Sequence, residues 1–359
     1  MSFLKKINVF RKWATKLLRR NISGKQRFEN TGIIEKEAIK RILICRPNHR
    51  LGNQLLITPL VQEVSDLFPD AKIDLFVKGG IAAILYKNYP TVDHIISLPK
   101  KHFSHLWQYV SAWFVLKSTY YDLVINAAAN SSSGNLAIKL SNAPYKFFGN
   151  EINGEHLAAK YSDYEHMAKH PIYGLRDFLS THGITTPNLI PSLDIRLGDS
   201  EIANGKKLLE QIASAEAKVI SLFTFATGEK MLSPVWWETF YNKLAATFPN
   251  YSFIEILPIE NVSQLDYKIP TFYSKDVREI AAVIANTNLF IGADSGMMHL
   301  ASASLTPTVG LFGATTKDWY QPYNNNSLGM NSNDVSQEAI IKEVSAILKK
   351  RLHFVSDEV

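Results

Sequence analysis

Short apolar runs alternate with stretches of helical periodicity from about residue 40 onward. The first runs have the length of buried strands, and helical stretches lie between them. The strands are expected at 42–45, 73–77, 94–97 and 123–126. The helices are expected at 54–67, after residue 77 up to about 86, and at 101–120. Repeated β-α units of this kind predict a mostly parallel sheet with right-handed crossovers. The aromatic-rich helix at 101–120 is expected to cover this sheet, with Trp107 and Trp113 as packing residues.

The pattern weakens around residues 186–197, where Pro187 and Pro191 indicate an extended linker, and a second series then begins. Its strands are expected at 219–224, 253–257, 289–291 and 308–312, and its helices at 234–247, 277–285, 297–304 and 335–352. We therefore predict an α/β protein of two Rossmann-like domains that face each other across a cleft, with ligands at the carboxyl ends of the strands. The predicted boundaries are 1–38 for an N-terminal arm, 39–190 and 191–335 for the two domains, and 336–359 for a C-terminal helix.

Positive charge is concentrated at the N-terminus. The 359-residue chain has a formal net charge of +6, but residues 1–27 hold nine Lys or Arg and no acid. Apolar residues recur there at helical spacing with most of the basic side chains opposite, which predicts a basic amphipathic helix suited to an anionic membrane surface. A disordered tail is the alternative. Nucleic-acid binding is disfavoured because the basic character stops at this arm.

Composition narrows the class of protein further. Apolar residues make up 46% of the chain, enough for a substantial core. The single cysteine, Cys45, lies in an apolar run, which indicates a structural thiol and a reducing compartment. Since no uncharged apolar stretch reaches about 18 residues, no membrane-spanning helix is expected.

Residues 289–313 carry the most informative motif. An apolar strand ends at Gly292, the polar turn Asp294-Ser295-Gly296 follows, and a helix begins. Such a helix directs unpaired backbone N–H groups and its positive dipole end at a ligand above the strand, which suits a phosphate. His299 lies four residues after Ser295 and shares its helix face. The simpler interpretation is that Asp294 and Ser295 only cap the helix.

The whole run resembles the C-terminal donor-site motif of the lipopolysaccharide heptosyltransferase family, glycosyltransferase family 9. In that family Asn/Asp-Asp-Ser-Gly-Pro-x-His-Leu-Ala-Ala is followed by Thr-Pro and a strand that ends Phe-Gly. The matching residues are Asp294, Ser295, Gly296, His299, Leu300, Ala301, Thr306, Pro307, Phe312 and Gly313. Met297 replaces the usual Pro. The resemblance covers about residues 40–330 and implies a GT-B fold.

The first strand–helix junction resembles the family's N-terminal motif, strand-Arg-x-x-x-x-Gly-Asp-x-x-x-x-x-Pro. The matches are Arg50, Leu51, Gly52, Thr58 and Pro59, and later Phe68, Pro69, Asp70 and Ala71. The resemblance places Arg50 and Gly52 on the acceptor side.

Asn53 departs from this motif, because the family has an Asp there as the general base for the acceptor hydroxyl. An amide cannot take that proton. Three interpretations stay open. Asn53 orients the acceptor while another group, for which His49 is a candidate, accepts the proton; transfer is slow without a strong base; or transfer activity has been lost.

The loop at 223–237 resembles a third family motif, in which the Lys of Lys-x-Trp-Pro contacts the donor phosphate. Lys230 matches that Lys, although Leu232 stands where Trp is usual and the spacing to Pro234 is one residue longer. A solvated loop lysine is the alternative. Thr227 would add a hydroxyl to the donor diphosphate site, and Gly228 would allow the backbone to approach the diphosphate closely. By family position, Glu260 fits a ribose or base contact.

The chain has no Asp-x-Asp and no Cys/His spacing typical of a metal site. Charge on a leaving diphosphate is therefore expected to be met by Lys230, helix N-terminal amides and His299, without a metal ion. Metal independence is also what the resemblance to GT-B enzymes implies.

The resemblance implies an inverting glycosyltransferase, without a resident cofactor, at the inner face of the cytoplasmic membrane. It would move heptose or a related sugar from a nucleotide-diphospho-sugar, with ADP-heptose as the precedent, to a lipopolysaccharide core or other lipid-linked saccharide. One alternative is a non-catalytic homologue that binds nucleotide sugars or glycans, and another is a GT-B epimerase. A nicotinamide dehydrogenase is disfavoured, since no Gly-x-Gly-x-x-Gly follows the first strand.

Overall fold

The computed structural model describes residues 32–101, 105–149, 154–214 and 217–356. Residues 33–359 form one structural unit, and the description below is of that unit. The amphipathic helix predicted within residues 1–27 lies outside the described residues, so it stays a prediction.

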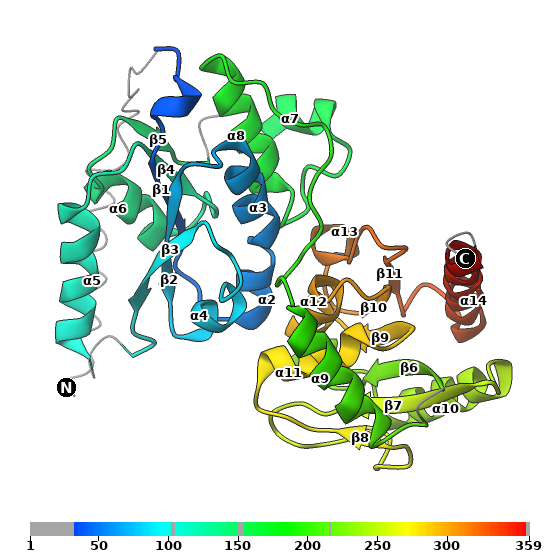
Figure 1. The fold of residues 1–359 in the computed structure, drawn as a ribbon. Helices are drawn as coiled ribbons and strands as arrows, with labels where there is room; N and C mark the ends of the chain where they lie inside the picture. The colour runs from blue at the N-terminus through cyan, green and yellow to red at the C-terminus, as the bar shows by residue number, and fades with distance from the viewer. Residues whose placement is uncertain (1–31, 102–104, 150–153, 215–216, 357–359) are drawn as a thin grey trace, which may run out of the picture. The chain divides into compact units, whose positions relative to one another are not determined.

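A five-stranded parallel sheet, in the order β3-β2-β1-β4-β5, forms the first half of this unit (Figure 1). The elements of this half are η1 (Lys36–Ala38), β1 (Arg41–Arg46), α2 (Leu51–Leu55), α3 (Thr58–Leu67), β2 (Lys72–Lys78), α4 (Ile81–Leu85), β3 (Val92–Leu98), α5 (Leu106–Ser118), β4 (Leu123–Asn126), α6 (Ser132–Leu140), β5 (Tyr145–Phe147), α7 (Gly154–Lys160) and α8 (His170–Thr181). Central β1 is buried from Ile42 to Cys45 because both of its faces are covered, as the unbroken apolar run predicts.

A six-stranded parallel sheet, in the order β11-β10-β9-β6-β7-β8, forms the second half. The elements of this half are α9 (Asp199–Glu210), β6 (Lys218–Phe223), η3 (Gly228–Lys230), α10 (Pro234–Thr247), β7 (Tyr251–Ile256), β8 (Thr271–Phe272), α11 (Val277–Ala285), β9 (Leu289–Ala293), α12 (Gly296–Ala303), β10 (Thr308–Phe312), α13 (Lys317–Tyr320), β11 (Leu328–Asn331) and α14 (Gln337–Ser356).

Both sheets have the Rossmann strand order, in which the first strand is central and later strands add to its other side. The strand order therefore reverses between β1 and β4 in one sheet and between β6 and β9 in the other. Open α/β sheets bind ligands at the carboxyl ends of the strands beside such a switch point. The loops that follow these four strands are thus the places to look for a site.

The two halves share an apolar core. The largest apolar cluster contains Ile44 and Leu60 of the first half together with Val283 and Leu300 of the second. Separate clusters cover the opposite face of each sheet, under α5 and α6 in the first half and under α10 and α14 in the second. The candidate motifs lie at the carboxyl ends of the strands in both sheets. The shared cluster holds these ends next to each other.

The helix predicted at 54–67 is in fact two helices, α2 and α3. Pro59 is the reason, because a proline has no N–H and its ring clashes with the carbonyl four residues earlier. The helix therefore stops after Leu55 and restarts with Pro59 in its first turn. The hydroxyl of Thr58 donates to the Leu55 carbonyl oxygen across the break, at 2.8 Å.

The packing role predicted for Trp107 is wrong, since this side chain is 88% exposed. Trp113 does pack, with its ring centroid 5.0 Å from that of Phe76 on β2. The residues of α5 that face the sheet are Tyr109, Ala112, Trp113 and Leu116, and Trp107 lies on the other side of the helix.

Two other expectations are confirmed. Cys45 is fully buried in β1, and burial raises the pKa of its thiol, as expected of a structural cysteine. Residues 184–198 contain no helix or strand, in agreement with a linker around 186–197. Among the described residues no helix combines the length and apolar character needed to cross a membrane.

Candidate functional site

Lys230 and Asp294 meet at the switch point of the second sheet. Lys230 lies on the loop after β6 and Asp294 directly after the neighbouring strand β9. The Lys230 Nζ atom lies 2.7 Å from Asp294 Oδ2, and the Thr315 hydroxyl donates to the same oxygen. Asp294 is 3% exposed, whereas the Lys230 side chain is 34% exposed. The buried carboxylate therefore fixes an ammonium group whose other N–H donors remain open to a ligand.

Helix α12 begins beside this ion pair. Ser295 is its N-cap, and the Ser295 Oγ atom accepts a hydrogen bond from the Met298 amide at 3.4 Å. Ser295, Gly296 and Met297 are half-buried, while the rest of the helix is buried. The capping interpretation therefore holds for Ser295, but Asp294 pairs with Lys230. The accessible first turn, with its dipole and unpaired amides, is suited to an anion.

The first half of the unit contacts the start of α12 through Gly52. A β-carbon on Gly52 would lie 2.8 Å from the Cδ2 atom of His299, and one on Gly296 would lie 3.3 Å from the Gly52 amide nitrogen. A side chain at Gly52 would force the His299 ring to shift, and one at Gly296 would be in tight contact with the Gly52 backbone. The acceptor-side and donor-side motifs, which are far apart in sequence, thus lie against each other.

His299 is buried beside this contact. Burial lowers the pKa of His299 to about 4, the negative charge of Asp294 partly offsets this, and His166 and Lys230 lower the pKa further. Burial likewise lowers the pKa of His166 to about 4, and its Nε2 atom lies 2.8 Å from the Gln321 carbonyl oxygen. Both imidazoles are therefore neutral near pH 7, so His299 offers a hydrogen bond to a diphosphate but no charge.

Acid pH is expected to destabilise the fold through these two histidines. In the unfolded chain an imidazole binds its proton near pH 6.5, but in the folded protein it does so only near pH 4. The unfolded state thus binds more protons between these values. The stabilisation is full above pH 6.5 and is lost as the pH falls toward 4, by about 3 kcal/mol for each buried histidine.

Urea unfolding at pH 7.5 and pH 5 measures this effect. We expect His166→Gln and His299→Gln each to reduce the pH dependence, while His105→Gln, at an exposed position, leaves it unchanged. Equal pH dependence in the wild type and both buried variants would contradict this assignment.

A half-buried arginine holds the side chain of Asn53. The Nη2 atom of Arg46, at the end of β1, donates to Asn53 Oδ1 at 2.8 Å. Arg46 pairs with no carboxylate among the described residues, and its buried Nε atom has no hydrogen-bond partner. Burial lowers the pKa of Arg46, partly offset by Tyr320 and Tyr86.

Arg46 is a candidate ligand-binding residue that sequence reasoning missed. A charge that is partly withdrawn from water is costly unless an opposite charge meets it, so Arg46, with its buried and unpaired Nε atom, is suited to an anionic group of a substrate. Its place at the carboxyl end of the central strand was the signal that could have found it, since ligands bind at that end.

His49 and Arg50 are exposed at the start of the same junction. Partial burial lowers the pKa of His49, and the nearby charges of Lys78, Lys100 and Arg50 lower it further. A β-carbon on Gly79 would lie 3.4 Å from the His49 Cβ atom and 2.8 Å from Lys100 Cε, so these side chains gather at the ends of β2 and β3. This basic group is suited to an acidic acceptor.

Thr227 and Gly228 lie exposed on the loop of Lys230. Gly228 has a φ of +64° and open space around its α-carbon. Glycine is therefore favoured there by the backbone conformation of the loop and not by a close neighbour. The predicted donor-side residues Thr227, Gly228 and Lys230 are therefore together, near Asp294.

Glu260 is exposed on the loop after β7, and its side chain makes no hydrogen bond or ion pair to the described residues. The structure instead buries Glu255, at the end of β7, which sequence reasoning missed. Its two carboxylate oxygens accept hydrogen bonds from Thr224 and Ser263, each at 2.5 Å, and burial raises its pKa. Glu255 thus joins the loops that follow β6 and β7.

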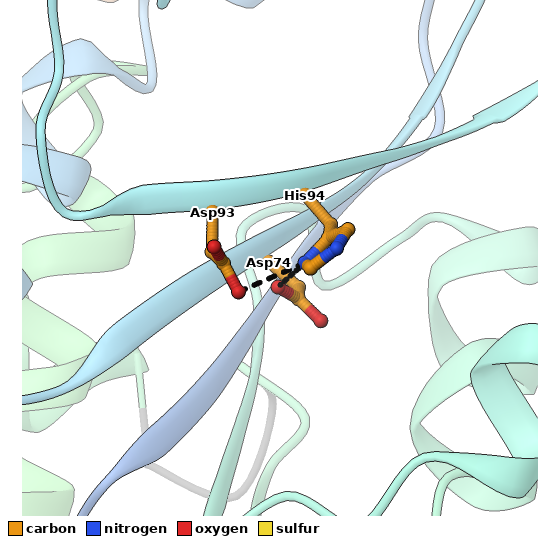
Figure 2. Close-up of side chains that lie close together, drawn as sticks. All are labelled: Asp74, Asp93 and His94. Carbon is orange, nitrogen blue, oxygen red and sulfur yellow. Dashed lines mark ion pairs between the residues drawn. The ribbon is translucent and has the colours of Figure 1, made fainter.

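Asp74, Asp93 and His94 form a cluster with the composition of a metal site on the first sheet (Figure 2). Arg41 already supplies a cation there, because its Nη2 atom lies 2.9 Å from Asp74 Oδ2, 3.2 Å from His94 Nδ1 and 3.8 Å from Asp93 Oδ2. We therefore assign no metal to this cluster.

Two parallel Rossmann sheets with ligand motifs at their switch points are the GT-B architecture. Residues 275–350 match the family model described as glycosyltransferase family 9 (heptosyltransferase). Lipopolysaccharide heptosyltransferase 3 of Escherichia coli is 24% identical over 300 residues, which span 77% of this chain and 85% of the relative.

Solved structures show the same fold. A glycosyl transferase family 9 protein from Veillonella parvula has a TM-score of 0.70 at 17% identity and covers 88% of this chain and 99% of its own. Escherichia coli heptosyltransferase WaaC with ADP has a TM-score of 0.62 at 16% identity, over 86% and 99% of the two chains. The chain is thus similar to the heptosyltransferases of glycosyltransferase family 9, in sequence over residues 275–350 and to the relative above, and in fold to the solved structures.

Proposed function

We propose that the enzyme transfers heptose or a related sugar from a nucleotide-diphospho-sugar to a lipopolysaccharide core or another lipid-linked saccharide. The observation that carries this proposal is the Lys230–Asp294 pair at the start of α12. An ammonium group beside helix N-terminal amides is suited to a diphosphate. WaaC is known with ADP and with ADP-2-deoxy-2-fluoro heptose, which supports ADP-heptose as the donor.

The donor would bind to the second half of the unit, within the domain predicted at 191–335. Lys230 and the amides of Ser295 and Gly296 would meet the diphosphate, with a hydrogen bond from neutral His299. Thr227 and Gly228 would approach it from the exposed loop, and Glu260 would reach the ribose or base. Because these groups supply charge and oriented dipoles to the leaving diphosphate, the proposed reaction needs no metal and no resident cofactor.

The acceptor would bind to the first half, within 39–190, beside Arg50 and Gly52. In a single displacement with inversion, the acceptor oxygen attacks the anomeric carbon as the bond to the diphosphate oxygen breaks. The hydroxyl proton must pass to a base. His49 is the candidate, because its lowered pKa keeps it neutral near pH 7.

A non-catalytic binding homologue is the second candidate function. The hydrogen bond from Arg46 to Asn53 favours it, since this amide oxygen has no capacity to take a proton. Transfer assays with Asn53 and His49 variants separate the two functions.

We expect the wild type to release ADP from ADP-heptose only when a lipid-linked core acceptor is present. Asn53→Asp is expected to raise the rate on the order of 100-fold, because a carboxylate beside the acceptor is a better base. His49→Gln should slow the wild type by a similar factor but leave Asn53→Asp nearly unchanged. Asn250→Asp, at an exposed turn, is the matched control.

The outcomes distinguish the hypotheses clearly. Transfer by Asn53→Asp but not by the wild type supports the binding homologue. No transfer by either protein, with acceptors that a relative uses, contradicts the proposed function.

A further inference from the structure

Helix α5 is apolar on the side that faces away from the protein as well as on the side that packs. Trp107, Val110 and Phe114 are 88%, 51% and 70% exposed. Their spacing of three and four residues places them on one helix face. Leu106 and Val115 lie at the two borders of this face and are 58% and 44% exposed. We call these five residues the outer face of α5.

An exposed apolar surface of this kind marks an interaction site, because burying it in a partner is favourable. The helix covers one face of the first sheet and is the outermost element on that side in Figure 1, so no other described element lies beyond it. Trp113, on the opposite side, already anchors α5 to the sheet through Phe76. The outer face is therefore not needed to hold the helix in place.

The charged residues of α5 and of the chain segments next to it in sequence have one sign. No acidic residue occurs between Asp93 and Asp122, a stretch that contains Lys100, Lys101 and Lys117. All three lysines are exposed, two before α5 and one in its last turn. Aromatic and aliphatic side chains bordered by lysine, without acids, are the composition of helices that lie in the interface of an anionic bilayer.

A second copy of the chain fits this surface less well. In a symmetric dimer the same patch meets itself, so the lysines of the two copies would face each other. An anionic bilayer instead provides both an apolar layer for Trp107 and Phe114 and negative charge for the lysines.

We propose that the outer face of α5 docks on an anionic lipid bilayer, independently of residues 1–27. Lys100, which precedes α5 in the chain, has its side chain over Gly79 next to His49 on the acceptor side. Docking through α5 would thus bring the basic group at the ends of β2 and β3 to the membrane surface. Only this last consequence rests on the proposed function, in which the acceptor is lipid-linked.

Vesicle binding by the full chain tests the proposal. We expect sedimentation with phosphatidylglycerol-containing vesicles, and weaker sedimentation with pure phosphatidylcholine vesicles. Trp107→Ser combined with Phe114→Ser should lower the partition coefficient about tenfold or more, because two interfacial aromatic anchors are lost. Val235→Ser combined with Ile259→Ser is the matched control, since these residues are 72% and 69% exposed in the second half of the unit.

Fluorescence quenching by brominated lipids identifies the helix itself. Trp13 lies in the predicted amphipathic helix of residues 1–27, so the reference protein carries Trp13→Phe. In that protein Trp107→Phe should remove most of the quenching, although four other tryptophans remain. Unchanged partition of the double variant, or unchanged quenching in Trp107→Phe, would show that α5 does not dock and would overturn the proposal.

Sedimentation velocity without lipid tests the alternative that a second copy of the chain binds the outer face. We expect the same mass for the wild type and the Trp107→Ser, Phe114→Ser variant. A dimer that the variant dissociates would assign the outer face to a second copy and overturn membrane docking. These measurements need neither donor nor turnover, so they fail or succeed separately from the transfer assay.

Discussion

Replacing Lys230 with alanine is expected to weaken ADP binding, and kcat/KM for the donor, on the order of 100-fold. Two effects combine. The diphosphate loses its ammonium partner, and Asp294, 3% exposed, keeps a negative charge without its cation beside the phosphate site. Isothermal titration with ADP and initial rates with ADP-heptose measure the two quantities.

Two further variants sharpen this test. Adding Asp294→Asn to Lys230→Ala should restore part of the ADP affinity, because the repulsive carboxylate is then gone. Lys275→Ala removes a lysine from an exposed position in the same half and should leave ADP binding unchanged. If the two lysine variants behave alike, Lys230 is only a solvated loop lysine.

Replacing Arg278 with methionine is expected to reduce the free energy of unfolding by about 3–5 kcal/mol, the range for breaking a buried ion pair. Arg278, on α11, is 5% exposed, and its Nε and Nη2 atoms donate to the two carboxylate oxygens of Glu201 at 2.6 and 2.7 Å. The hydrogen bond from Arg278 is the main reason that the pKa of Glu201 is lowered to about 2.

The same guanidinium also joins the two halves of the unit. It donates to the carbonyl oxygens of Ile84 and Leu85 in α4 at 3.3 and 3.4 Å, and to those of Ile195 and Arg196 in the linker at 3.0 and 3.1 Å. Loss of Arg278 leaves these carbonyls and a carboxylate without their donor.

Urea unfolding of the full chain measures this loss. Lys243→Met is the matched control, since the ion pair of Lys243 with Glu338 is exposed and pairs of that kind contribute at most about 1 kcal/mol. A loss below 1 kcal/mol for Arg278→Met would show that the link between the halves does not depend on this residue.

Long periodic segments were predictable from the sequence because burial on one face leaves a repeat in the apolar residues. The helices α10 and α11 and the strands β4 and β10 begin and end where expected. The edge strand β8 has two residues, too few to show any period. The outer face of α5 could not be recognised, because a helix apolar on both sides does not reveal which side packs.

The candidate site was predictable in part. Lys230, Asp294 and Gly52 each belong to a recognisable motif beside a strand end, and the switch-point topology brings those ends together. Arg46 and Glu255 were missed for a physical reason. A sequence shows that a residue is charged, but only the fold shows that it is buried and which partners it has.

The donor site at α12 is tested most directly by titrating the full chain with ADP, UDP and GDP in a calorimeter. We expect ADP to bind more tightly than the other two nucleotides and its affinity to fall on the order of 100-fold in Lys230→Ala. Failure of all three nucleotides to bind, or equal ADP affinity in the wild type and Lys230→Ala, would contradict a nucleotide-sugar site at Lys230 and α12.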